Sequence, residues 1–204
     1  MLKKFTKRLT LLTLGLIFLL HGHSLEAKPT KLKLDKTHSQ VEFSVKHLGI
    51  SKVGGKFLKF NTEVVWDEED PSQSSIKGEI DVTSIDTGNK RRDNHLRSGD
   101  FFNAKKYPTI TFESTSITAS EDDEDEFVVS GKLTVKDVTK DITFRLEIVG
   151  QVKGPRGKTR TAMEAELKIN RFDYNVKWDN KLKDGNLIVD ETVKIEILTQ
   201  FISK

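Results

Sequence analysis

The segment from Arg91 to Pro108, RRDNHLRSGDFFNAKKYP, places several chemically active side chains close together in the sequence. Arg91, Arg92 and Arg97 surround His95. Guanidinium groups pair with phosphate oxygens in a forked geometry, and an imidazole exchanges protons near neutral pH. These four side chains are therefore candidates for binding a phosphate or carbonyl group.

The spacing in this segment predicts a short helix over residues 91–97. Arg91 and His95 are four positions apart and would share one helix face, and Asp93 and Arg97 form a second such pair that can salt-bridge. A glycine just beyond these residues is expected to end the helix. The competing interpretation is a capping helix whose arginines are simply solvated.

Two adjacent aromatic residues, Phe101 and Phe102, follow this predicted helix. They are expected to turn the chain back toward a sheet and to plug the mouth of an apolar enclosure. Pro108 disfavours helix immediately before the next strand. The competing interpretation is that the two rings complete a solid core.

The remaining motifs indicate no metal or hydrolytic site. Beyond residue 27 the histidines are His38, His47 and His95, and their spacing matches neither H-x-x-H nor HExxH. The sequence contains no G-x-S-x-G, and the pair Gly54-Gly55 is interpreted as a tight turn. The acidic run 121–126 lacks the glycine of a sharp calcium loop and is interpreted as a solvated hairpin loop. No catalytic residue, metal or cofactor is predicted.

The first residues have the composition of an export signal. Lys3, Lys4, Lys7 and Arg8 precede an apolar run that is too short to span a bilayer as a helix, which takes about 20 residues. We therefore predict a cleaved signal peptide over residues 1–27 and one domain over residues 28–204, located in the periplasm or secreted. The mature protein is not expected to be an integral membrane protein.

Removing this leader changes the charge balance. The whole chain has 34 Lys and Arg against 31 Asp and Glu, and residues 1–27 hold four of the bases and one acid. The mature chain is then close to neutral, so no basic face for nucleic acid is indicated. The chain has no cysteine, so packing rather than disulfides must hold it together.

Alternation of apolar and polar residues predicts about eight strands, each with one buried face. No long crossover helix is indicated, so the strands are expected to be antiparallel, in a sandwich or a closed barrel. The apolar sets that show this alternation are Val41–Val45, Leu58–Trp66, Ile76–Val82, Ile110–Phe112, Phe127–Val135, Ile142–Ile148, Met163–Ile169 and Val193–Ile197. Residues 170–183 break the rhythm, like the segment described above, and both are expected to cap the sheet.

Three blocks resemble the YceI-like family of exported proteins: LDKTHSQVEFSVKHLGISKVGGKF, IDVTSIDTGNKRRDNHLRSGDFFNAKKYPTITFESTSI and VSGKLTVKDVTKDITF. The resemblance runs from about Leu32 to the C-terminus. It implies an all-β fold, an eight-stranded antiparallel β-barrel of lipocalin-like shape with short helical excursions. It also implies an internal channel for a long-chain amphiphile such as a polyprenyl pyrophosphate, an isoprenoid quinone or a fatty-acyl lipid.

Applied to this sequence, the resemblance and the strand parity together predict the residues of the channel. The wall is expected to contain Phe43, Val45, His47, Leu58, Phe60, Leu96, Phe101, Phe102, Phe112, Phe144 and Leu146. The polar head group of the lipid is expected to meet Arg91, Arg92, His95 or Arg97 near the opening.

The resemblance implies a non-enzymatic lipid-binding protein, and a homodimer is left open. Two alternatives remain at the level of sequence. The first is an enzyme acting on a lipid through His47 or His95, with Asp93 or Asp100 as the neighbouring acid. The second is a filled barrel that serves as a structural or interaction module. The acidic run Glu121–Glu126 is not part of the family pattern.

Overall fold

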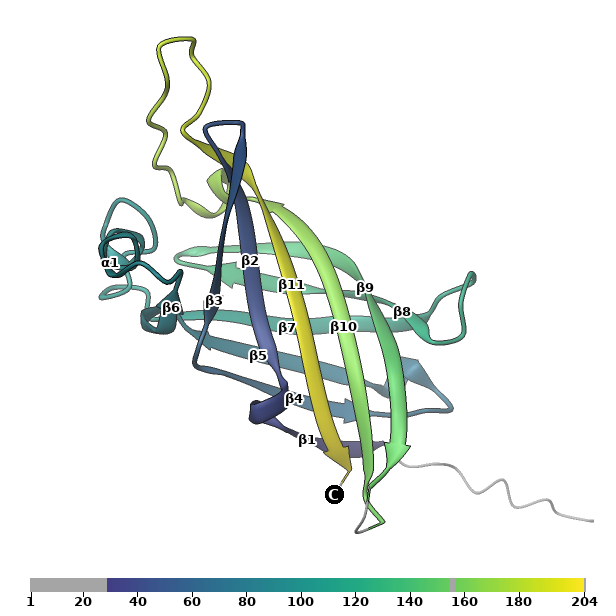
Figure 1. The fold of residues 1–204 in the computed structure, drawn as a ribbon. Coiled ribbons are helices and arrows are strands. Elements are labelled where there is room, and N and C mark those ends of the chain that lie inside the picture. The colour runs from purple at the N-terminus through teal and green to yellow at the C-terminus, as the bar shows by residue number, and fades with distance from the viewer. Residues whose placement is uncertain (1–28, 155–156, 204) are drawn as a thin grey trace, which may run out of the picture.

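The structure is a computed structural model that describes residues 29–154 and 157–203; the predicted signal peptide, residues 1–27, lies outside them. The described chain forms one sheet, with a single α-helix, α1, at one side (Figure 1). The strands are β1 (Thr30–Leu34), β2 (Gln40–His47), β3 (Ser51–Phe57), β4 (Phe60–Trp66), β5 (Ser75–Asp81), β6 (Ile85–Asp86), β7 (Thr109–Ala119), β8 (Glu126–Val135), β9 (Val138–Lys153), β10 (Thr159–Asn170) and β11 (Val189–Ser203). The helices are α1 (Lys90–Arg97) and the short 3-10 segments η1 (Lys36–His38), η2 (Pro71–Gln73), η3 (Val82–Ser84) and η4 (Arg171–Tyr174).

The sheet closes because β1 pairs with β4 on one side and with β11 on the other. The closed ring runs β1-β4-β5-β7-β8-β9-β10-β11, and every pair in it is antiparallel. This confirms the predicted eight-stranded antiparallel barrel with short helical excursions. Closure leaves the strands of the ring without an open edge over their paired lengths.

Strand β11 is long enough to pair with two different strands, β2 and β1, along one edge. Its first part, Val189–Leu198, pairs with β2, and its last part, Phe201–Ser203, pairs with β1. Between β1 and β2 the chain makes η1, which Asp35 caps by accepting from the amide of Thr37. Strands β2, β3 and β6 therefore form an arm that continues the sheet beyond the ring (Figure 1).

One prediction about the N-terminal half was wrong. Gly54-Gly55 is not a turn but the middle of β3, and the turn lies between β2 and β3 at Leu48 and Gly49, which both have positive φ. Gly55 has a packing role, since a Cβ there would lie 2.5 Å from Cζ of Phe43. The β3 strand was overlooked because two glycines read as a turn when the ring that covers one of them is unknown.

The interior falls into two groups of buried residues, and the predicted inward faces supply part of each. The first includes Val64, Trp66, Phe127, Met163 and Phe201, and the rings of Trp66 and Phe127 meet edge to face at 4.9 Å. The second group lies toward α1 and η4. Its members are Val41, Phe57, Val82, Ile85, Phe101, Ala104, Ile110, Leu133, Val135, Tyr174 and Val176.

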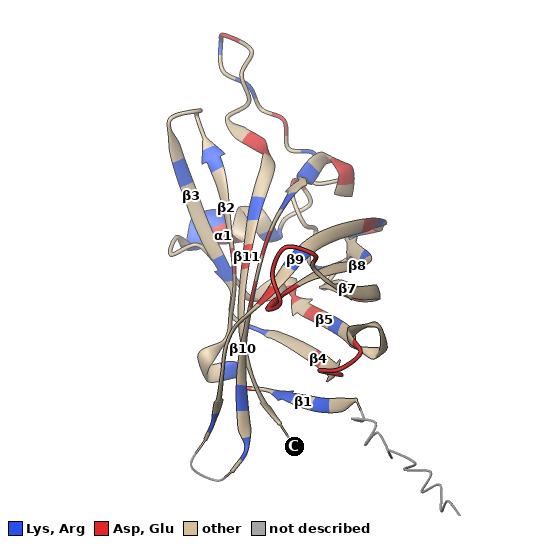
Figure 2. Cartoon of the chain, turned by 90° about the vertical axis from the view of Figure 1, so that its right-hand side faces the viewer, with Lys and Arg blue, Asp and Glu red and all other residues tan. Residues whose placement is uncertain are grey.

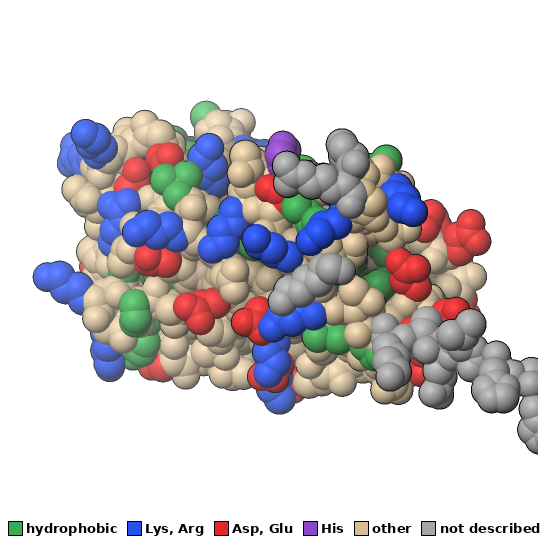
Figure 3. All heavy atoms as spheres, turned by 90° about the horizontal axis from the view of Figure 1, so that it is seen from below, with side chains coloured by type: hydrophobic (Ala, Val, Ile, Leu, Met, Phe, Trp, Pro, Cys, Tyr) green, Lys and Arg blue, Asp and Glu red, His purple; other side chains and the backbone are tan. Residues whose placement is uncertain are grey.

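Charges are spread over the outside of the barrel. The acidic run lies on the hairpin between β7 and β8, as predicted, and its residues 121–125 are exposed (Figure 2). Arg145 of the neighbouring β9 pairs with Asp122 and Glu126. Seen from below, Lys and Arg lie beside Asp and Glu with small apolar areas between them (Figure 3). No helix within residues 29–154 and 157–203 has the length and hydropathy needed to cross a membrane.

Candidate functional site

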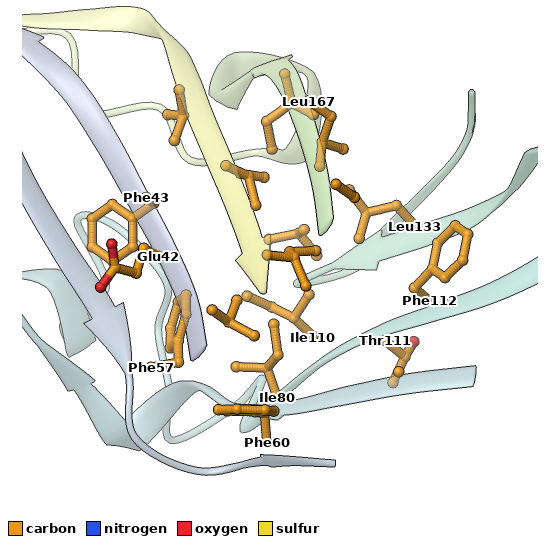
Figure 4. A pocket seen from close by; sticks show the side chains of 18 of the residues that line it. Glu42, Phe43, Phe57, Phe60, Ile80, Ile110, Thr111, Phe112, Leu133 and Leu167 are labelled. Carbon is orange, nitrogen blue, oxygen red and sulfur yellow. The ribbon is translucent and has the colours of Figure 1, made fainter. Parts of the chain in front are cut away.

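The barrel encloses a cavity of about 240 Å³. Its lining is mainly aliphatic and aromatic, and it receives side chains from opposite walls: Phe43, Phe57 and Phe60 face Phe112 and Leu133 across it (Figure 4). Barrels of eight strands have an interior that is either filled by side chains or able to hold one small ligand. This interior is not packed shut, which argues against the solidly filled barrel.

The wall contains most of the residues predicted for it. Phe112 and Phe144 pack with ring centroids 5.4 Å apart, and Phe43 and Phe57 with centroids 5.6 Å apart. The predicted wall residues that line the cavity are Phe43, Val45, Phe60, Leu96, Phe101, Phe102, Phe112, Phe144 and Leu146. For Phe43, Val45, Phe60, Phe112, Phe144 and Leu146 the inward direction followed from strand parity. Leu96, Phe101 and Phe102 lie on α1 or in the loop after it and were predicted from the resemblance.

Leu58 was wrongly placed in the wall. Its side chain is 60% exposed, because Leu58 lies in the turn between β3 and β4, where its amide donates to Ser84 O. The inward position is taken by Phe57, the last residue of β3. The strand parity was extended across a turn, where alternation no longer applies. His47, the last residue of β2, is half-buried and is not among the residues that line the cavity, so its predicted place in the wall is also wrong.

Glycine makes room for one of the cavity rings. Gly131 on β8 lies opposite Ser114 of β7, and a Cβ at Gly131 would fall 2.5 Å from Cζ of Phe112 and 2.5 Å from the backbone oxygen of Glu113. The ring of Phe112 therefore lies flat against the strand instead of projecting further into the cavity. A bare backbone at such a point commonly marks the close approach of another group.

The two non-strand segments meet at one end of the cavity, as their predicted capping role requires. Phe101 stacks on Trp178, with ring centroids 5.5 Å apart and planes 26° apart. The ring of His95 meets both edge to face, at 5.0 Å and 5.8 Å. Phe102 adds an edge-to-face contact with Phe57 at 6.3 Å. The aromatic residues thus join α1, the loop after it and the segment after η4.

Helix α1 forms as predicted, with Asn89 as its N-cap and Ser98 at its C-terminal end. The predicted pair of Asp93 and Arg97 is wrong. Asp93 is buried and accepts hydrogen bonds from the amide of Thr87 at 2.9 Å and from its hydroxyl at 2.6 Å. The carboxylate thus holds the loop before the helix, and a negative charge is favourable near a helix N-terminus.

Two arginines of α1, Arg92 and Arg97, fasten the helix to the chain that precedes it. Arg97 donates from Nε to Thr83 O at 2.9 Å and from Nη2 to Ile85 O at 2.7 Å. Arg92 donates from Nε to the hydroxyl of Thr87 at 2.7 Å and from Nη2 to its carbonyl at 2.8 Å. These guanidinium groups are already occupied by protein oxygens, which disfavours their use as ligands for a head group.

None of the four predicted head-group residues lines the cavity. Arg91 is exposed, and Arg92, His95 and Arg97 lie on or beside α1, outside the lining. His95 Nε2 lies 2.9 Å from Oδ2 of Asp100, and both side chains are substantially exposed. This pair is a histidine with a neighbouring acid, as the enzyme alternative requires, but neither residue lines the cavity.

Arg171 and Tyr174 of η4 are among the polar residues that line the cavity, and neither was predicted from the sequence. The guanidinium of Arg171 donates to the carbonyl oxygens of Val176, Val189 and Asp190 at 2.7–2.8 Å. Burial lowers the pKa of Arg171 and raises the pKa of Tyr174. A signal was present, because Arg171 continues the inward parity of Met163–Ile169 on β10.

Comparison with known proteins agrees with this geometry. The YceI-like domain family matches residues 32–201. Protein YceI of Escherichia coli O157:H7 is 37% identical over 190 residues, which is 92% of this chain and 97% of that protein.

Two solved structures share the fold. The crystal structure of BcnA from Burkholderia cenocepacia is 27% identical, with a TM-score of 0.72, and the match covers 82% of this chain and 99% of that one. A polyisoprenoid binding domain from Saccharophagus degradans, implicated in plant cell wall breakdown, has a TM-score of 0.61 over 87% of this chain and 100% of its own. At 16% identity the latter is a likeness of fold alone.

The closed sheet and its cavity define the class of protein, an antiparallel β-barrel with an apolar interior. Within that class the family match covers most of the chain and includes the strands, α1 and η4. The chain belongs to the YceI-like family.

Proposed function

We propose that this chain is an exported, non-enzymatic protein that holds one long isoprenoid or acyl chain inside its barrel. The observation that carries the proposal is the cavity of about 240 Å³ with its aliphatic and aromatic lining. Burying apolar surface contributes about 25 cal/mol per Å², so several hundred Å² of ligand tail would contribute on the order of 10 kcal/mol before ordering costs. The tail would therefore supply most of the affinity.

The ligand class follows from the same lining. Such a wall accepts methyl-branched and straight chains alike, so a polyprenyl pyrophosphate, an isoprenoid quinone and a fatty-acyl lipid are the proposed ligands. The predicted leader supports a periplasmic or secreted location, where the protein would exchange its ligand with a membrane and serve in transport or storage. The solved neighbour from Saccharophagus degradans is described as polyisoprenoid-binding, which agrees with this proposal at the level of the fold.

Extraction of the gently purified protein with organic solvent, followed by mass spectrometry, tests whether a lipid co-purifies. Binding is then measured by the fluorescence of diphenylhexatriene, an apolar probe, and by its displacement with long-chain lipids. The variant Ala165→Phe fills part of the cavity, since Ala165 is buried in its lining, and Ala119→Phe adds the same ring at an exposed position of β7.

We expect Ala165→Phe to weaken probe binding by about 5- to 150-fold, because the added ring takes space that the probe would occupy and such crowding costs about 1–3 kcal/mol. Ala119→Phe is expected to bind like the wild type. Equal binding by both variants, or a wild-type protein that binds neither probe nor lipid, would contradict the proposal. Turnover of a bound lipid that is lost in His95→Gln would instead favour the enzyme.

A further inference from the structure

The cavity contains a small polar region formed by η4 in a wall that is otherwise mainly apolar. Tyr174 and Arg171 are one turn of η4 apart, and both belong to the lining. Both are buried, with 2% and 5% of their surfaces exposed. A buried polar group in such surroundings is costly unless a partner satisfies it.

The hydroxyl of Tyr174 makes no hydrogen bond within residues 29–154 and 157–203. No fully buried polar side-chain atom of these residues lacks a partner, so this hydroxyl must reach open space. The other tyrosine, Tyr107, is different, since its hydroxyl donates to Oδ2 of Asp137 at 3.2 Å on the surface. A buried tyrosine usually finds a partner for its hydroxyl. Burial raises the pKa of Tyr174, so the hydroxyl keeps its proton and remains a donor.

The guanidinium of Arg171 is partly satisfied by hydrogen bonds, and its Cζ lies 4.2 Å from the centroid of the Phe172 ring, a cation–π contact. It has five N–H donors, and three backbone carbonyls accept from it. Arg171 forms no ion pair with any carboxylate of the described chain. The nearest acids act on it only at longer range, and burial lowers its pKa. An oxygen that accepts a hydrogen bond would stabilise this cation.

We propose that Tyr174 and Arg171 form the head-group subsite of the cavity and bind an acceptor oxygen carried at one end of the ligand. A quinone or amide carbonyl and a phosphate oxygen share this chemistry. This proposal rests on the proposed function, since it assigns the polar end of the same ligand. It places that end inside the barrel, at η4, and not at α1, where Arg92 and Arg97 are bonded to Thr83, Ile85 and Thr87 and Arg91 is exposed.

The test compares three ligands with the same hydrocarbon chain: octadecane, octadecanamide and octadecyl phosphate. Each displaces diphenylhexatriene from the wild type, from Tyr174→Phe and from the control Tyr107→Phe, which removes the other tyrosine hydroxyl. We expect Tyr174→Phe to bind octadecane like the wild type. We expect it to bind octadecanamide about 2- to 10-fold more weakly and octadecyl phosphate about tenfold or more weakly, as the loss of one neutral or charge-assisted hydrogen bond implies.

A second measurement separates a ligand-binding role from a structural one. Without ligand, Tyr174→Phe is expected to unfold at about the same temperature as the wild type, because it removes a hydroxyl that makes no hydrogen bond within residues 29–154 and 157–203. A marked loss of stability would overturn the proposal, since it would show that the hydroxyl stabilises the protein itself. The same preference among the three ligands in Tyr174→Phe, or an equal shift in Tyr107→Phe, would also overturn it. If no ligand binds the wild type, the proposed function itself fails.

Discussion

Replacing Gly131 by alanine tests the link between packing and the cavity. A Cβ at this position would lie 2.5 Å from Glu113 O and 2.5 Å from Cζ of Phe112. The backbone oxygen belongs to β7, which pairs with β8 on both sides of Gly131, so it cannot retreat without disturbing the ladder. The ring of Phe112 lines the cavity and can move only by turning into it.

The magnitude follows from two opposing effects. Crowding of the added Cβ destabilises the folded protein by about 1–3 kcal/mol. Replacing glycine also lowers the conformational entropy of the unfolded chain, which stabilises the folded protein by about 0.4–1 kcal/mol. The expected net loss in the free energy of unfolding is about 1–2 kcal/mol, which lowers the melting temperature of a domain of this size by roughly 2–8 °C. The matched control is Gly150→Ala on β9, where a Cβ meets no heavy atom within 4 Å.

Urea and thermal unfolding of the ligand-free proteins measure these differences, and displacement of diphenylhexatriene measures binding. We expect Gly131→Ala to be less stable and to bind more weakly, and Gly150→Ala to be as stable as the wild type or up to about 1 kcal/mol more stable. If Gly131→Ala equals Gly150→Ala in both stability and affinity, the proposed crowding between Gly131 and Phe112 does not exist.

Three further predictions concern residues outside the cavity. Arg97→Ala loses its bonds to two backbone carbonyls and should be about 1–3 kcal/mol less stable in urea unfolding. The preference of Arg97→Ala between octadecyl phosphate and octadecanamide should stay unchanged. A changed preference would indicate that the head group binds at α1. The guanidinium of Arg160 and the imidazole of His38 hold the pKa of Asp35 below its ordinary value. Because this pKa is lower in the folded than in the unfolded chain, its stabilisation is present above about pH 4 and is lost as the pH falls through the folded value. Between neutral pH and about pH 3, the free energy of unfolding should therefore fall less in Asp35→Asn than in the wild type. An equal fall in both proteins would refute this. Leu58→Ala should change the free energy of unfolding by no more than about 0.5 kcal/mol. A clear loss of probe binding in this variant would show that Leu58 does line the cavity.

Local pattern was enough to predict much of the fold. The inward and outward faces of β4, β5 and β7–β11 were read from residues that alternate with a period of two, and α1 was read from helical spacing between Arg91 and Arg97. The resemblance to the YceI-like family then decided between a sandwich and a barrel. Strand β3 was missed because two glycines read as a turn, although Gly55 lies under the ring of Phe43.

The candidate site was predicted less evenly. Phe43, Phe60 and Phe112 were placed correctly because a strand fixes which way each side chain faces. The arginines of α1 were misjudged because a sequence shows a charge but not the oxygen that already binds it. Arg171 was overlooked although it continues the inward parity of β10.

For this chain, residue order alone determined which faces of the strands are apolar and where the two capping segments interrupt them, because both are local properties of neighbouring residues. Only the closed barrel decided that an open space remains between those faces, that Phe101 stacks on Trp178, and that Tyr174 has no hydrogen-bond partner among the described residues. These features depend on groups brought together from distant parts of the chain. Their arrangement requires long-range strand pairings, such as those of β1 with β4 and β11, which no single segment encodes.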